Sequence, residues 1–178
     1  MKPSKNWDEV CYPFIHQTDC LCDFEVVTDE WCTLIGMAYS ATEGDAQLAD
    51  LAADLAHLQP LAFHVNGSIR GKLAIEESDV QWVLDRMQYY RRELGELEHS
   101  FVLPRGTAPV PQLHQARSSA KKAIRAMVRV EQEGREVPDV LPRICNALCN
   151  LFFLMTLVCN LRRGVQEVPF VSKSYKVC

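Results

Sequence analysis

The sequence predicts an all-α protein, an antiparallel up-and-down bundle of five helices. Apolar residues recur at three- and four-residue spacing in five stretches, and short connections that carry Gly or Pro separate most of them. Little of the chain shows the alternating pattern of a strand. The 178 residues suit one domain that buries its core without cross-links, so we expect residues 1–178 to form a single helical domain that begins with an irregular segment, residues 1–27.

The first two helices follow from a cap and from leucine spacing. We expect the first over residues 28–43, because Thr28 is a good N-cap and two acidic residues follow it at the positive end of the helix dipole. Residues 22–27, just before it, suggest a short strand. The second is expected over residues 45–65, with a kink at Pro60, whose ring clashes with the preceding turn.

The last three helices are marked by capping residues and by their stops. The third is expected over residues 78–97, because Ser78 and Gln81 have the spacing of a capping box. The fourth follows a pair of prolines and ends before Gly134. The fifth, expected over residues 139–160, contains the most apolar stretch of the chain.

Composition narrows the class of protein. A net charge of −4 argues against general nucleic-acid binding. The N-terminus shows no secretory signal, and the eight cysteines are scattered, which predicts a cytoplasmic protein with reduced thiols. The apolar stretch 147–161 is interrupted by two asparagines and is shorter than the roughly 20 residues of a membrane span. We therefore interpret it as a buried core helix, with no membrane partner.

The fourth helix carries the clearest polar pattern. Basic side chains recur there at three- and four-residue steps and so share one stripe, which we call the basic stripe: His114, Arg117, Lys121 and Arg125, widened by Lys122 and Arg129. Arg and Lys bind phosphate oxygens through charge-assisted hydrogen bonds, so the stripe is a candidate phosphate site. A solvated basic face is the alternative.

Other candidates are weaker. Asp29 suits the first turn of a helix by its charge alone. Asn146 and Asn150 share a face of an apolar helix, which also fits a structural hydrogen bond between helices. Phe101 fits a core aromatic residue at a helix entry. Four clustered residues could bind zinc, but two of them lie closer together than zinc ligands usually do, so we predict no metal site there: Cys11, His16, Cys20 and Cys22.

Several motifs resemble, in order and spacing, those of the PduO-type ATP:cob(I)alamin adenosyltransferases. They span residues 24–160: Asp29-Glu30, Ile35-Gly36, Phe101-Val-Leu-Pro-Arg-Gly, Leu113-His-Gln-Ala-Arg117, Lys121-Lys-Ala-Ile-Arg125 and Asn146-Ala-Leu-Cys-Asn150. The resemblance implies a ferritin-like five-helix bundle that forms a homotrimer with sites between subunits. It also implies transfer of the 5′-deoxyadenosyl group of ATP, with Mg²⁺, to cob(I)alamin.

The resemblance also assigns roles. Asp29 and Arg117 match an ion pair that shapes the corrinoid pocket, and they are the predicted catalytic residues. Phe101 matches the aromatic residue that lies below the corrin and keeps the axial ligand off cobalt. The remaining matches fall in the nucleotide site: Lys121 and Lys122, where the family has two arginines, together with Arg125 and Asn146.

Departures from the family pattern concentrate on the nucleotide side. Residues 1–27 lack the Thr-Gly-Asp-x-Gly loop that wraps the ATP phosphates, and four polar family positions are changed: Cys32, Ile124, Ala147 and Asn150. Two hypotheses follow, an adenosyltransferase with an altered nucleotide site and a degenerate paralogue that binds a corrinoid without adenosylating it. The basic stripe favours the first, because a protein that binds only a corrinoid has no need of Lys121 and Arg125.

Overall fold

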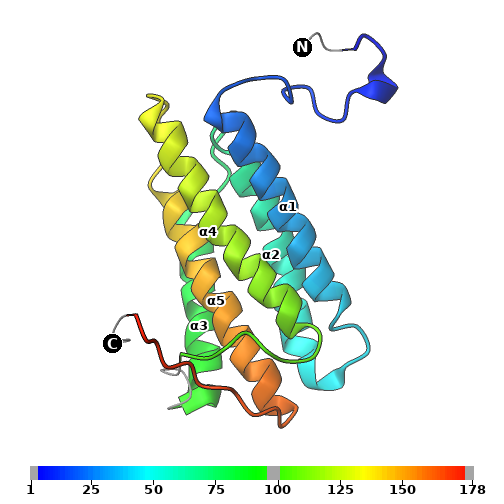
Figure 1. Ribbon diagram of the computed structural model, residues 1–178, viewed down its shortest axis with the longest axis vertical. Helices are drawn as coiled ribbons and strands as arrows, with labels where there is room; N and C mark the ends of the chain where they lie inside the picture. Colours follow the sequence, from blue (N-terminus) through cyan, green and yellow to red (C-terminus); the bar gives the residue numbers. More distant parts are fainter. Residues whose placement is uncertain (1–3, 96–100, 175–178) are drawn as a thin grey trace.

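The computed structural model of the protein describes residues 4–95 and 101–174. Within them, five α-helices form one bundle in which each helix runs antiparallel to the one before it (Figure 1). Two single-turn 3-10 helices, η1 (Trp7–Glu9) and η2 (Ala46–Leu48), precede α1 and α2. The predicted all-α fold is confirmed, with these helices: α1 (Cys20–Ser40), α2 (Ala49–Gly67), α3 (Glu77–Leu94), α4 (Val110–Gln132) and α5 (Val140–Arg162).

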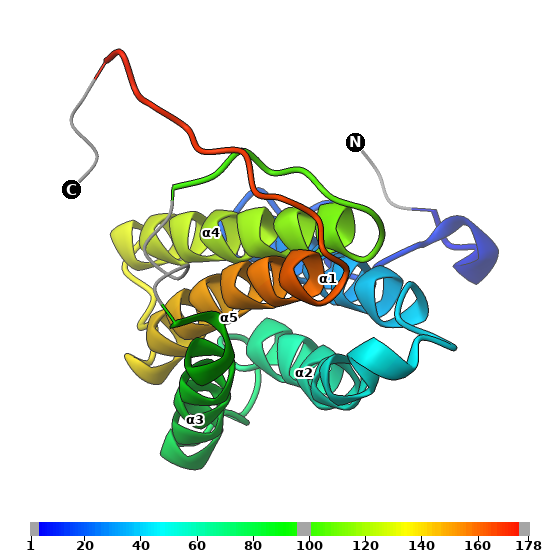
Figure 2. The ribbon, with the colours of Figure 1, turned by 90° about the horizontal axis from the view of Figure 1, so that it is seen from below.

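Helix α5 occupies the centre of the bundle. Seen along the helices, it lies between α4 on one side and α2 and α3 on the other (Figure 2). It packs along α4 and α3, whereas α1 packs along α4 and α2. Of its 23 residues, 16 are buried. By length and composition α5 would qualify as a membrane span, but most of it is buried inside the bundle, so its interpretation as a core helix is confirmed.

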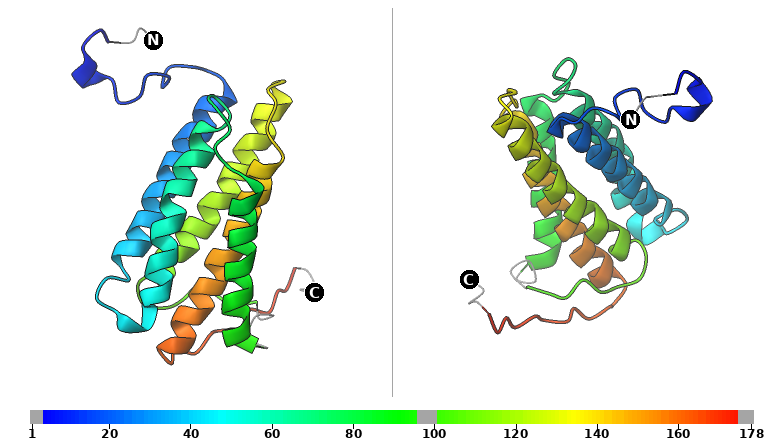
Figure 3. Two further views of the ribbon diagram at one scale, coloured as in Figure 1. Left: turned by 180° about the vertical axis from the view of Figure 1, so that it is seen from behind. Right: turned by 45° about the horizontal axis from the view of Figure 1, so that its top comes forward.

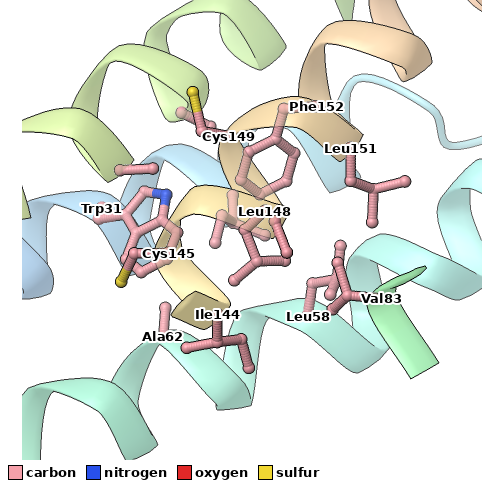
Figure 4. Close-up of a cluster of buried hydrophobic side chains, with 14 of the residues drawn as sticks. Trp31, Leu58, Ala62, Val83, Ile144, Cys145, Leu148, Cys149, Leu151 and Phe152 are labelled. Atoms are coloured by element: carbon pink, nitrogen blue, oxygen red, sulfur yellow. The ribbon is translucent and has the colours of Figure 1, made fainter. Parts of the chain in front are cut away.

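Side chains from four helices meet in the core (Figure 4). Trp31 of α1 is fully buried and lies edge-on to Phe152 of α5, with ring centroids 6.4 Å apart. Leu58 of α2 and Val83 of α3 are also fully buried in this cluster. Burial of apolar surface of this kind is the dominant favourable term in folding, so α5 holds the bundle together mainly through contacts of this kind.

Helix α1 begins eight residues earlier than expected, so the prediction of a strand over residues 22–27 is wrong. Asp19 caps the helix by accepting a hydrogen bond from the backbone N–H of Cys22 at 3.1 Å. Leu21 and Phe24 then face the core at helical spacing. Asp29 consequently lies in the middle of α1 and not in its first turn, which removes the dipole explanation for its presence.

The start of α1 is hard to recognise from the sequence because it contains a charged residue that is buried in the fold. Glu25 is 4% exposed, and its two oxygens accept hydrogen bonds from Nε and Nη2 of Arg70 at 2.5 and 2.7 Å. The same guanidinium lies 3.9 Å from the ring centroid of Phe14 and donates to Gln17. This anchors the later part of the N-terminal segment, while its earlier residues run out beyond the top of α1 (Figure 3).

A second buried network joins α2 to α3. Asp54 is 6% exposed, and its Oδ2 accepts hydrogen bonds from Arg86 Nε at 2.7 Å and from the hydroxyl of Tyr90 at 2.6 Å. Tyr90 is fully buried, and burial together with the Asp54 carboxylate raises the pKa of its hydroxyl. The tyrosine therefore stays a hydrogen-bond donor throughout the physiological pH range.

The remaining helix ends lie near the expected positions. The capping box of α3 forms between Glu76 and Asp79, so its assignment to Ser78 and Gln81 is wrong. Helix α2 continues through Pro60 as one element. The expected end of α3 at residue 97 lies outside the described residues.

Candidate functional site

The basic stripe occupies the outer face of α4, because alanines and other apolar side chains bury the opposite face. Three predicted phosphate ligands, Lys121, Lys122 and Arg125, are exposed there. Together with Arg129 and with Val27 of α1, they line an open depression of about 440 Å³. The structure thus brings the three residues together on one concave surface of high positive charge.

One carboxylate of α1 lies beside this depression. Glu30 Oε1 is 3.9 Å from Lys122 Nζ, and both side chains are more than half exposed. Exposed ion pairs of this kind contribute about 0–1 kcal/mol to stability. Lys122 is therefore held only weakly by its own chain and is free to bind an anionic ligand.

Arg117 lies between α4 and α5. It is half-buried, with its guanidinium carbon 5.0 Å from the ring centroid of Phe153. A cation over an aromatic face is attracted by the ring quadrupole, which fixes the orientation of the guanidinium. Sequence reasoning did not single out Phe153, although its place seven residues after Asn146 puts the two on one helix face.

Asp29 and Arg117 do not meet within one chain. Helices α1 and α4 pack together, yet no ion pair between Asp29 and Arg117 forms among the described residues. Asp29 is exposed and instead borders a pocket of about 330 Å³ that Tyr12 and Ile15 of the N-terminal segment help to line. The ion pair that the family resemblance implies does not form within one chain, and it stays a prediction for a contact between subunits.

Phe101 is not a core residue. It lies on the loop before α4 and is 48% exposed. The segment after α5 pairs with this loop: Leu103 N–H donates to Val168 O at 2.9 Å, and Phe170 N–H donates to Phe101 O at 2.8 Å. The rings of Phe101 and Phe170 lie 5.6 Å apart. The two segments run side by side near the lower end of α5 (Figures 1 and 3), a pairing that no sequence pattern indicated.

The asparagines of α5 are exposed, so their interpretation as a buried bond between helices is wrong. Asn146 donates from Nδ2 to Pro142 O of its own helix at 2.9 Å, and Asn150 lies one turn later. Cys149 lies between the two asparagines in the sequence. Burial raises the pKa of its thiol, while the nearby positive charges of Lys121 and Arg117 lower that pKa. The asparagine face of α5 therefore adjoins the basic stripe.

The altered family positions line the interior more than the surface. Cys32 and Ala147 are buried, and Ile124 packs against the core. Asn150 alone among the four is exposed. The polar side chains exposed on this surface therefore come mainly from the basic stripe and from the two asparagines.

The four metal-ligand candidates near the N-terminus do not converge. Cys22 is buried, and its Sγ donates to Phe14 O at 3.2 Å, whereas Cys11 and His16 are exposed. Over residues 4–95 and 101–174, no group of three or more His, Cys, Asp and Glu side chains is placed to hold a metal ion. The seven cysteines in these ranges are free thiols.

His114 begins the stripe and has an unusual titration. Burial and the positive charge of Arg117 lower its pKa to about 4. Its side chain borders a shallow depression between α1 and α4 that Glu30 and Lys122 also line. At neutral pH the imidazole is therefore uncharged, and it adds no charge to the basic stripe.

We expect His114 to make the folded protein less stable in acid. Its pKa of about 4 lies below the value of roughly 6.5 in the unfolded chain. As pH falls between these values, the unfolded state binds a proton that the folded state does not, so the free energy of unfolding falls. Urea unfolding of wild type and His114→Asn from pH 7.5 to 4.5 should show wild type losing its relative stability as pH drops. A difference that does not change with pH would contradict the assignment.

Three comparisons place the chain among known proteins. Residues 15–159 match the profile of the cobalamin adenosyltransferase family. The chain is 29% identical over 147 residues to the corrinoid adenosyltransferase of Bacillus subtilis, covering 80% of this chain and 75% of that protein. It is 32% identical over 122 residues to the cobalamin adenosyltransferase of Cupriavidus metallidurans, covering 67% and 65% of the two chains.

Solved structures show the same fold. Two variants of the PduO-type ATP:corrinoid adenosyltransferase from Lactobacillus reuteri are similar to the chain. One, complexed with cobalamin and ATP, has a TM-score of 0.77 at 19% identity and covers 88% of each chain. The other, complexed with ATP, has a TM-score of 0.78 at 20% identity and covers 87% of this chain and 89% of that one. The family profile and the sequence relatives agree, the helical fold is consistent with them, and the chain belongs to the cobalamin adenosyltransferase family.

Proposed function

We propose that the protein transfers the 5′-deoxyadenosyl group of ATP to cob(I)alamin. Membership of the family supports the reaction class. The observation that carries the proposal for this chain is the depression lined by Lys121, Lys122 and Arg125, because several neighbouring cationic side chains suit the multiple negative charges of a triphosphate.

The reaction explains what such a surface does. The cobalt nucleophile attacks the 5′ carbon of ATP, a cobalt–carbon bond forms, and the carbon–oxygen bond breaks as triphosphate leaves with its electron pair. The protein supplies no covalent group, so it must orient two large substrates and neutralise the leaving group. Lys121 and Lys122 supply point charges without the bidentate geometry of arginine.

Mg²⁺ would enter with the nucleotide. The side chains that line the depression are cationic or apolar and offer no carboxylate ligand. Mg²⁺ is commonly held through substrate phosphates and water, which fits a site of this composition. The ion, when bound, would offset further negative charge on the triphosphate.

We also propose a cytoplasmic homotrimer with shared sites. Support comes from Arg117, which stacks on Phe153 and has no carboxylate partner within the described part of its own chain, and from Asp29, which is exposed on another face. The partner subunit would bring the two charges together. Light scattering that found a stable monomer at micromolar concentration would contradict the shared site.

The proposed function is tested by separate titrations with ATP and cobalamin, followed by the optical spectrum under reducing conditions. We expect both to bind, and an adenosyl–cobalt spectrum to appear. Lys121→Ala should lower kcat/KM by roughly 10²- to 10³-fold, as for loss of one oriented charge at a leaving group. Lys72→Ala, an exposed lysine outside the stripe, serves as the matched control.

The same titrations distinguish the adenosyltransferase from the alternative, a paralogue that binds a corrinoid without adenosylating it. The corrinoid-side residues Asp29, Phe101 and Arg117 are present while the phosphate loop is absent, so we expect corrinoid binding to be the better preserved of the two. Corrinoid binding with no detectable ATP binding or transfer would identify a corrinoid-binding paralogue. Tight ATP binding without corrinoid binding would contradict both assignments.

A further inference from the structure

Asn160 binds two separate segments at the end of α5. It is 2% exposed, and its Nδ2 donates to the backbone O of Arg105 at 2.9 Å and to Glu167 Oε1 at 2.8 Å. Arg105 belongs to the loop that carries Phe101, and Glu167 belongs to the segment that follows α5. One buried amide therefore connects both segments to the last turn of the central helix.

The carbonyl oxygen of the same amide fixes how closely the loop approaches. Asn160 Oδ1 is buried without a hydrogen-bond partner among the described residues. A Cβ added to Gly106 would lie 2.5 Å from it, and Gly106 has φ of +149°, which residues with a side chain rarely adopt. An unpaired buried carbonyl costs free energy. The close approach of Gly106 to Asn160 Oδ1 therefore fixes the position of the loop, although it leaves this oxygen unpaired and so lowers stability.

Arg163 anchors the far end of the loop. Its Nη1 donates to Thr107 Oγ1 at 3.0 Å and to Ala108 O, and its Nη2 donates to Asp45 Oδ2 at 2.5 Å. These bonds fix the entry to α4. They leave the Phe101 end of the loop dependent on its pairing with the C-terminal segment.

That pairing is where Asn160 acts on Phe101. Phe101 is half exposed, and its loop is held by two backbone hydrogen bonds to the C-terminal segment, one at Phe101 O and one at Leu103 N–H. Since Asn160 holds the loop through Arg105 and the segment through Glu167, it fixes the two relative to each other. We propose that Asn160 is a positioning residue that sets the place of Phe101. Only the contact of Phe101 with a corrinoid rests on the proposed function.

Amide hydrogen exchange tests the positioning without any ligand. In Asn160→Ala, the amides of Leu103 and Phe170 should exchange about 10- to 100-fold faster, because each lost hydrogen bond changes an opening equilibrium by roughly tenfold. Asn66→Ala is the matched control, since Asn66 also donates two hydrogen bonds, to Glu25 O and Thr28 Oγ1, at the opposite end of the bundle. It should leave those two amides unchanged.

A milder variant covers the case in which Asn160→Ala fails to fold. Glu167→Ala removes only one of the two bonds and should accelerate the same two amides by a smaller factor. Unchanged exchange of Leu103 and Phe170 in both variants, or equal acceleration in Asn66→Ala, would overturn the proposal.

Enzyme assays then separate positioning from a merely structural role. Asn160→Ala should lower kcat by roughly 10- to 100-fold, as for a small misplacement of a contact group, with KM for ATP unchanged. Electron paramagnetic resonance of bound cob(II)alamin should show a larger fraction with the axial ligand on cobalt. The proposal would be overturned if Asn160→Ala left the spectrum unchanged and lowered kcat/KM equally for ATP and for the corrinoid. If the wild-type protein shows no adenosyl transfer, the proposed function is wrong. The amide hydrogen exchange experiment still decides whether Asn160 positions Phe101.

Discussion

Replacing Arg117 by alanine is expected to cost the assembled protein about 3–5 kcal/mol, the usual loss when one partner of a buried ion pair is removed. Within one chain, Arg117 stacks on Phe153, and Asp29 lies exposed on α1. If subunits join these two side chains, both are desolvated, and either single substitution leaves an uncompensated charge in the interface. Corrinoid binding should weaken in parallel.

A double-mutant cycle measures this pair. Arg117→Ala and Asp29→Ala should each lower the free energy of unfolding of the proposed trimer, and the double variant should lose less than the sum, with a coupling of about 0.5–3 kcal/mol. The exposed pair of Arg143 and Glu77 is the control, because solvent screens it and its coupling should be close to zero. Additive losses for Arg117 and Asp29 would place them apart in the assembly as well as in the chain.

The second large effect is expected at Asp54. Asp54→Ala leaves the half-buried Arg86 guanidinium and the buried Tyr90 hydroxyl without their shared acceptor. The expected loss is about 3–5 kcal/mol in the free energy of unfolding, because the Arg86 charge loses its counter-ion and the Tyr90 hydroxyl loses its hydrogen-bond acceptor at once. Urea unfolding followed by circular dichroism measures it directly.

Two milder variants test the reason for that loss. Tyr90→Phe keeps the Asp54–Arg86 pair and should cost about 0.5–1.5 kcal/mol, as for one hydrogen bond. Asp85→Ala, an exposed residue beside Arg86, should change stability by no more than about 0.5 kcal/mol. A loss in Asp54→Ala as small as in Asp85→Ala would show that the network is not desolvated.

Local patterns in the sequence predicted the helices, and long-range partners explain the exceptions. The apolar face of α5 and the stops around α4 are readable from spacing. The first two turns of α1 were missed because Glu25 breaks the apolar pattern, and its partner Arg70 lies 45 residues away. Asp19 could have been identified from sequence, since an aspartate before a helical pattern is an N-cap signal.

For the site, helical spacing predicted that Lys121, Lys122 and Arg125 share one face, and the structure brings them together. It could not predict the pairing of Phe101 with the segment after α5, because backbone hydrogen bonds leave no mark in side-chain patterns. Asn160 was visible only as an interruption of an apolar stretch. The side chain of this asparagine donates hydrogen bonds to segments outside its own helix, so only the fold reveals its partners.

The central place of α5 has a consequence for synthesis of the chain. Translation produces α1 to α4 first, yet α3 packs closely against α5, and α5 carries more buried residues than any of the four. Until it emerges from the ribosome, the earlier helices expose the apolar faces that α5 later covers. Nascent chains of this length are therefore at risk of aggregation, and the bundle reaches its stable form in a late, cooperative step.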